Sequence, residues 1–111
     1  MRAGKLRHQI RLEKPEDARR ASGESRTAWK SAGVVYADLR PLTGKERQAA
    51  MQVTAEATWK ATLRAVPGVS IDRTFRVVEL ATGRVLDVVD VRDVMNRGRD
   101  LVLTLKEHAD A

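Results

Sequence analysis

The sequence predicts a mainly β protein: a small antiparallel six-stranded β-barrel or sandwich, with one short α-helix between strands 2 and 3. Apolar and polar residues alternate in several segments, which is the pattern of strands that bury one face. Turn-forming Gly, Pro and Asn residues separate these segments at short spacings. One capped helical stretch interrupts the series. The 111 residues suit a single compact domain, which we place over residues 1–111.

Two alternating segments predict the first two strands. They are "LRHQIRLE" at residues 6–13 and "VVYADLRPL" at residues 34–42. Residues 15–27, between these segments, are polar and contain Pro, Gly and Ser. We therefore expect a mobile loop there.

The alternation is longest in "VTAEATWKATLRA", residues 53–65, where it runs without a break. This pattern predicts one long half-buried strand with Ala57, Trp59, Ala61 and Leu63 on the same face.

The C-terminal part predicts three more strands. The segments at residues 73–80 and 84–91 flank the short turn "ATG" and predict a hairpin. The last strand, "DLVLTLKE" at residues 100–107, should point its leucines inward. We expect the tail, residues 107–111, to be frayed.

The stretch "RPLTGKERQAAMQ", residues 40–52, predicts a helix-containing excursion between strands 2 and 3. Thr43 can act as the N-cap, and Glu46 three residues later can complete a capping box. Pro41 ends the preceding strand because it has no amide donor for the ladder. The excursion carries three cations, which are Arg40, Lys45 and Arg47.

Composition limits the classes of protein that remain. There is no cysteine, which excludes disulfides and thiolate metal sites and fits a reducing cytoplasm. No apolar run approaches the roughly 20 residues that span a bilayer, and the N-terminus lacks the apolar core of a signal peptide. The net charge of +6 permits contact with nucleic acid or with an acidic protein surface.

The sequence offers no catalytic or metal-ligating constellation. His8 and His108 lack a second ligand at metal-like spacing. On a regular strand Asp87 and Asp93 share a face while Asp90 points away, so we expect solvated carboxylates or cross-strand partners of arginine. Nucleophile and phosphate-loop motifs are missing as well. We therefore expect no enzyme, with no catalytic residue, no metal and no cofactor.

Direct binding of nucleic acid by a free monomer is the alternative function. Small basic barrels that bind single strands combine a cationic groove with aromatic stacking platforms. Trp59 and Phe75 are expected in the core, which leaves Trp29 and Tyr36 as possible surface aromatics. Two aromatic side chains provide only a small surface for the stacking of bases.

An ordered succession of segments resembles the head-closure, or head–tail joining, proteins of long-tailed bacteriophages, which act as connectors or stoppers. The resemblance covers roughly residues 3–107. It starts with "AGKLRHQIRLEKP" and continues with "TAWKSAGVVYADLRPLTGKE". An Ala/Gln-rich stretch then leads through a long strand to "PGV", and "GRVLDVVDV" precedes the Leu-rich last strand.

The resemblance implies a virion protein that forms a homo-oligomeric ring at the neck between head and tail, after assembly in the host bacterial cytoplasm. Its partners would be a portal or adaptor protein, a tail terminator or tail protein, and packaged double-stranded DNA touched only through its backbone, with no membrane. The excursion would face the channel, with Arg40, Thr43, Lys45, Glu46, Arg47, Gln48 and Gln52 as its site residues. The loop between the first two strands would reach a neighbouring subunit or ring through Glu16, Asp17, Arg19, Arg20, Glu24 and Arg26.

Overall fold

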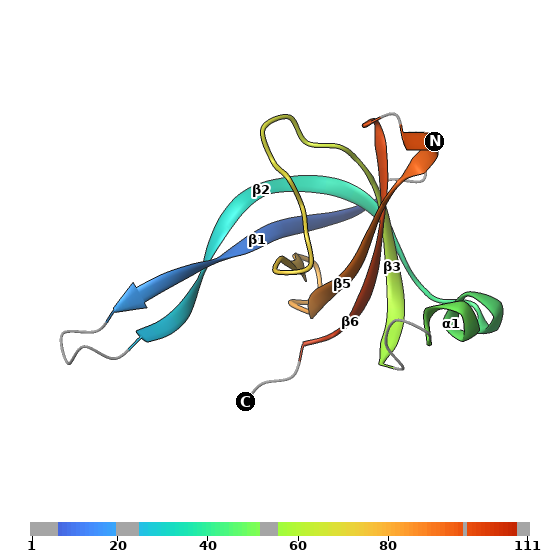
Figure 1. The fold of residues 1–111 in the computed structure, drawn as a ribbon, viewed down its shortest axis with the longest axis horizontal. Coiled ribbons are helices and arrows are strands. Elements are labelled where there is room, and N and C mark those ends of the chain that lie inside the picture. Colours follow the sequence, from blue (N-terminus) through green and yellow to red (C-terminus); the bar gives the residue numbers. More distant parts are fainter. Residues whose placement is uncertain (1–6, 20–24, 52–55, 97, 109–111) are drawn as a thin grey trace.

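The computed structural model describes residues 7–19, 25–51, 56–96 and 98–108. Six strands and one short α-helix follow one another along this part of the chain, as the sequence predicts (Figure 1). A 3₁₀ turn, η2, joins β5 to β6. The elements are β1 (His8–Arg19), β2 (Ser25–Pro41), α1 (Gly44–Ala50), β3 (Ala57–Arg64), β4 (Arg76–Glu79), β5 (Val85–Asp93), η2 (Val94–Asn96) and β6 (Asp100–Glu107).

The strands form a closed barrel in the order β1-β2-β3-β6-β5-β4, and every pairing is antiparallel. This confirms the predicted fold class. Closure removes most of the free strand edges that could pair with other chains.

The core is built from the inward-pointing residues that the alternation predicts. Ile10 and Leu12 of β1, Leu63 of β3 and Leu103 and Leu105 of β6 are fully buried there. Burial of such side chains contributes about 1.5–3 kcal/mol each to folding. Among the described residues, the core therefore follows the period of two in the sequence.

Two bulges correct the sequence reading of the faces. The register shifts between Ala57 and Trp59, so the unbroken strand predicted over residues 53–65 is shorter and its alternation is interrupted. Ala57 is buried but lies outside the core cluster that includes Ala61 and Leu63. Residues 53–55 lie outside the described part of the chain.

The second shift lies between Val88 and Asp90, which leaves one residue of β5 unpaired. Asp87 and Asp90 then oppose Lys106 and Thr104, two positions apart on β6, so they share the outer face. The prediction that Asp90 points away from Asp87 is therefore wrong, because a bulge reverses the alternation beyond it.

The predicted loop at residues 15–27 is instead mostly paired strand. Residues 14–19 of β1 pair with residues 25–30 of β2, and neither segment pairs with β3 or β4. We call these two segments the arm; it extends away from the barrel (Figure 1). The sequence reading failed because Pro15 lies at an edge where it forfeits little of the ladder. Residues 20–24 lie outside the described part of the chain.

The arm leaves the barrel at a bulge. The register of β1 and β2 shifts between Leu12 and Glu13, opposite Gly33. Gly33 has φ +140°, a conformation that side-chain-bearing residues rarely adopt. The glycine therefore permits the bend that sends the arm outward.

Residue 107, where we predicted the start of a frayed tail, is still part of the sheet. Glu107 is the last residue of β6, and the amide of His108 donates to the carbonyl of Val85 at 3.0 Å. Residues 109–111 lie outside the described part of the chain. No helix in the described ranges is long and apolar enough to cross a membrane.

Candidate functional site

The excursion contains a short helix whose start is fixed by the predicted capping box. The amide of Glu46 donates to Oγ1 of Thr43 at 3.2 Å, and the amide of Thr43 donates to Oε1 of Glu46 at 3.0 Å. The capping box thus gives each of these two amides an acceptor. Arg40 and Pro41 belong to β2, so the excursion proper begins at Leu42.

The helix is attached to the barrel through few contacts. The Glu46 carboxylate forms an ion pair with Lys60 of β3, and the amide of Leu42 donates to the carbonyl of Thr58 at 2.9 Å. The hydrogen bond from Lys60, together with the amide of Thr43, lowers the pKa of Glu46 to about 2. No residue of α1 is buried. The helix is therefore an appendage whose surface is free for contacts outside the subunit.

The predicted channel-facing residues differ in whether their side chains form ion pairs within the described chain. Lys45, Arg47 and Gln48 are exposed, and neither cation forms an ion pair with the described residues. Arg40 is held by Asp38, from Nε to Oδ1 at 3.1 Å, and this carboxylate raises the pKa of Arg40. Lys45 and Arg47 are therefore the cations of the excursion that remain available to an anion. Gln52 lies outside the described residues.

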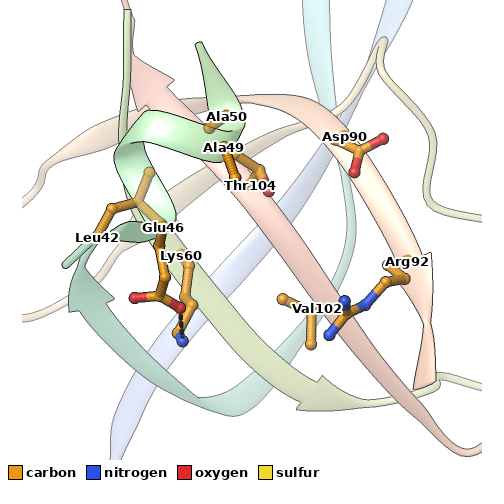
Figure 2. Close-up of a pocket in the computed structure, with 9 residues that line it drawn as sticks. All are labelled: Leu42, Glu46, Ala49, Ala50, Lys60, Asp90, Arg92, Val102 and Thr104. Atoms are coloured by element: carbon orange, nitrogen blue, oxygen red, sulfur yellow. Dashed lines mark hydrogen bonds and ion pairs between the residues drawn. The ribbon is translucent and has the colours of Figure 1, made fainter. Parts of the chain in front are cut away.

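A groove of about 310 Å³ separates α1 from the outer face of β3, β6 and β5 (Figure 2). Leu42, Ala49, Ala50 and Val102 supply its apolar lining. Figure 2 shows the Glu46–Lys60 pair along one side, with Asp90 and Arg92 on the other. The groove has an apolar lining between charged edges, which is an arrangement suited to an apolar partner group.

The base of the arm holds a cluster that the sequence reading missed. Glu13 is buried and accepts from Nε of Arg76 at 2.6 Å and from Nε of Arg11 at 2.9 Å. The Arg76 guanidinium also lies 4.3 Å from the centre of the Trp29 ring. This cation–π contact ties the first residues of the arm to β4. The cross-strand pairing Glu13↔Arg76 follows only once the register is known.

His108 completes this region. Its Nδ1 lies 2.6 Å from Oδ1 of Asp87, and its ring meets Trp29 edge-on at 6.3 Å between centres. His8 accepts a hydrogen bond from the amide of Leu39 at 3.3 Å. Both described histidines therefore have structural contacts. The described residues contain no group of three or more candidate metal ligands.

The predicted loop residues lie on or beside the arm. Glu16 is exposed on β1. Asp17, Arg19 and Arg26 belong to its paired strands by their backbone, and Arg20 and Glu24 lie outside the described residues.

The aromatic residues offer little flat surface for stacking. The Arg84 guanidinium covers Trp59 at 4.4 Å, and Phe75 is buried just before β4. Trp29 is half-buried beneath Arg76. Tyr36 is the large exposed aromatic ring of the described chain, with 57% of its surface accessible.

Comparisons with known proteins agree with this architecture. A family model described as phage head completion protein matches residues 1–108. Protein SF1141 from Shigella flexneri 2a, known from its solution structure, is 22% identical with a TM-score of 0.76, over 100% of both chains. A chain from the virion of a native gene transfer agent particle is 24% identical with a TM-score of 0.63, over 96% of this chain and 97% of that one. At these identities the two structures establish a shared fold. No curated protein matches the chain.

Proposed function

The chain belongs to the phage head completion protein family, and from this premise we propose that it forms a homo-oligomeric ring at the junction of head and tail. The ring closes the DNA-filled capsid and presents a docking surface to the tail. It contacts the portal or adaptor protein on one side and the tail terminator or another tail protein on the other. It occupies the virion neck after assembly in the host bacterial cytoplasm.

The observation that carries this proposal is the exposed, capped helix of the excursion. A seven-residue helix is marginal on its own, yet α1 buries none of its residues. Its capping box and the Glu46–Lys60 pair hold it in place instead. A partner that packs against α1 would supply the burial that the helix lacks within its own subunit.

A ring would gather the free cations of α1 around its axis. Lys45 and Arg47 of neighbouring subunits repel one another there when the channel is empty. DNA in the channel makes the arrangement favourable, because its phosphates attract the cations and its condensed counterions are released. Such contacts position the duplex without reading its sequence.

Two further observations support a structural virion role. A chain of the same fold belongs to the virion of a gene transfer agent particle. The described clusters of titratable residues also form ion pairs and caps, without a nucleophile and base converging in a pocket. We propose that the protein acts without catalysis.

Electron microscopy of the purified chain with its portal complex tests the ring. A ring stacked on the portal is the expected result, and a portal that stays bare under saturating protein would refute the proposal. DNA binding is measured on the same samples by gel shift over a series of salt concentrations. Binding by monomer alone, with micromolar affinity, would instead favour the nucleic-acid-binding alternative.

A charge-matched pair of variants locates the DNA contacts. Lys45→Ala/Arg47→Ala should flatten the dependence of ring–DNA affinity on salt, by about 0.9 in the logarithmic slope for each phosphate that is no longer neutralised. Arg64→Ala/Arg99→Ala removes the same charge from exposed positions elsewhere on the barrel and should leave the slope unchanged. Equal slopes for the two variants would show that only net charge matters.

A further inference from the structure

Three apolar side chains are exposed together on one outer face of the barrel. Val34 is 47% exposed, Tyr36 57% and Leu80 39%. Tyr36 and Val34 pair with Gln9 and Arg11 across the β1–β2 ladder, and the amide of Leu80 donates to the carbonyl of Gln9 at 3.1 Å. Val34 and Tyr36 therefore lie on β2 and Leu80 lies just after β4, on either side of Gln9 and Arg11 of β1. We call the three side chains the apolar patch. A patch of this kind marks an interaction surface.

The groove beside α1 lies on the other side of the barrel. The patch lies on β2 and just after β4, the two strands that flank β1 in the barrel order. The groove spans the remaining three strands, β3, β6 and β5. One face therefore projects apolar side chains, and the opposite face offers an apolar recess of about 310 Å³. Two different faces on opposite sides are what a head-to-tail contact requires, and such contacts generate rings when the rotation closes.

Arginine–aromatic pairing supplies a specific complementarity between the two faces. Arg76 covers Trp29 at 4.3 Å and Arg84 covers Trp59 at 4.4 Å. Neither the Tyr36 ring nor the exposed Arg92 at the edge of the groove has such a partner within the described chain. A second copy can give both side chains this partner, because Arg92 lies beside the recess that would receive the Tyr36 ring of that copy.

We infer that the apolar patch of one copy docks into the α1 groove of the next copy, with Arg92 over the Tyr36 ring. The inference rests on the proposed ring and identifies its subunit interface. Each subunit contributes the patch to one neighbour and the groove to the other. The contact orders α1 at the interface, which explains why the helix buries none of its residues within one subunit.

Site-directed crosslinking tests the contact against a cysteine-free background. Gln9→Cys places a thiol beside Tyr36, and Ala49→Cys places one on the wall of the groove. The double variant is treated with a short bismaleimide at rising protein concentrations and with the portal complex. A ladder of covalent oligomers beyond the dimer is expected. Each single variant should remain monomeric on the gel.

Matched variants separate the contact from chance collision. Met95→Cys/Ala49→Cys carries one thiol at an exposed position outside both faces and should give no ladder. In the Gln9→Cys/Ala49→Cys background, Tyr36→Ala or Arg92→Ala should lower the ladder yield by about 3- to 30-fold. Tyr36→Phe keeps the ring and should retain the yield.

Several results would overturn the inference. Crosslinked dimers of the Gln9→Cys single variant would mean that two patches face each other. A ladder no stronger than that of Met95→Cys/Ala49→Cys would mean that the thiols meet by chance collision. A ring seen on the portal without the ladder rejects this interface and leaves the proposed function standing. A ladder without any ring on the portal rejects the proposed function and leaves the head-to-tail contact standing.

Discussion

Glu13→Gln should destabilise the protein because this carboxylate joins β1 to β4. Glu13 lies where β1 leaves the barrel and binds Arg76 of β4 and Arg11 of its own strand. Its side chain is only 8% exposed. Glutamine keeps the shape but removes the charge from both hydrogen bonds. Arg11 is more exposed and can turn to water, whereas Arg76 lies half-buried against the Trp29 ring of the arm.

The expected loss in unfolding free energy is about 2 kcal/mol. Hydrogen bonds to charged groups contribute roughly 1.5–3 kcal/mol each, and the amide oxygen of the glutamine side chain restores part of one. Domains of this size are stable by about 5–15 kcal/mol, so the loss is a large fraction. The melting temperature should fall by roughly 8–10 °C, since about 4–5 °C corresponds to each kcal/mol at this length.

Urea unfolding monitored by tryptophan fluorescence measures the effect. Glu16→Gln is the matched control, because Glu16 is exposed on the same strand and has no ion-pair partner in the described chain. It should change stability by less than about 0.5 kcal/mol. Similar losses for both variants would show that the Glu13 cluster is no more than a surface ion pair.

The pH dependence of Glu13→Gln gives an independent check. Burial alone would raise the pKa of Glu13, but hydrogen bonds from Arg76 and Arg11, with their charges, lower it below the ordinary value of 4.5. A lowered folded-state pKa adds stability that is complete above the unfolded value and disappears as pH falls through the folded value. The difference between wild type and Glu13→Gln should therefore shrink below pH 4.5. A difference that stays constant down to pH 2 would contradict the charge-based explanation.

Three further predictions concern the excursion and the arm. Thr43→Ala should remove about 1 kcal/mol of local helix stability, seen as loss of helical chemical shifts in α1, while the global unfolding midpoint stays within error; a shift of the whole transition would mean that α1 supports the core. A carboxyl NMR titration should find the pKa of Glu46 near 2, so its pair with Lys60 persists from neutral pH to about pH 3 and is lost as pH falls through 2; a midpoint near 4.5 would exclude that pair in solution. Amides of the arm should exchange faster in the free protein than those of β3 and β6, because the arm pairs only with itself; equal protection would show that the arm is already supported.

The sequence predicted the barrel well where burial alone decides the pattern. Ile10, Leu12, Leu63 and Leu103 alternate with polar neighbours, and each is fully buried. The Thr43–Glu46 capping box is equally local, since all its atoms lie within four residues. Local spacing determines both features, so no knowledge of the register was needed.

The rest depends on contacts between distant residues. Glu13 meets Arg76 across 63 positions, and no local pattern marks either residue as a partner. The bulge between Val88 and Asp90 reverses the faces of β5 although the sequence continues to alternate. The arm was read as a loop because its composition is polar, although residues 14–19 and 25–30 form a paired ladder. The groove beside α1 also requires the tertiary fold.

Sheet closure has a consequence for the life of the subunit before assembly. Along the barrel, the backbone donors and acceptors are largely used within the subunit, while the arm keeps both outer edges open. Newly made copies can therefore accumulate in a crowded cell with little tendency to form backbone hydrogen bonds between strands of different copies. Any strand exchange between copies would therefore have to start at the arm.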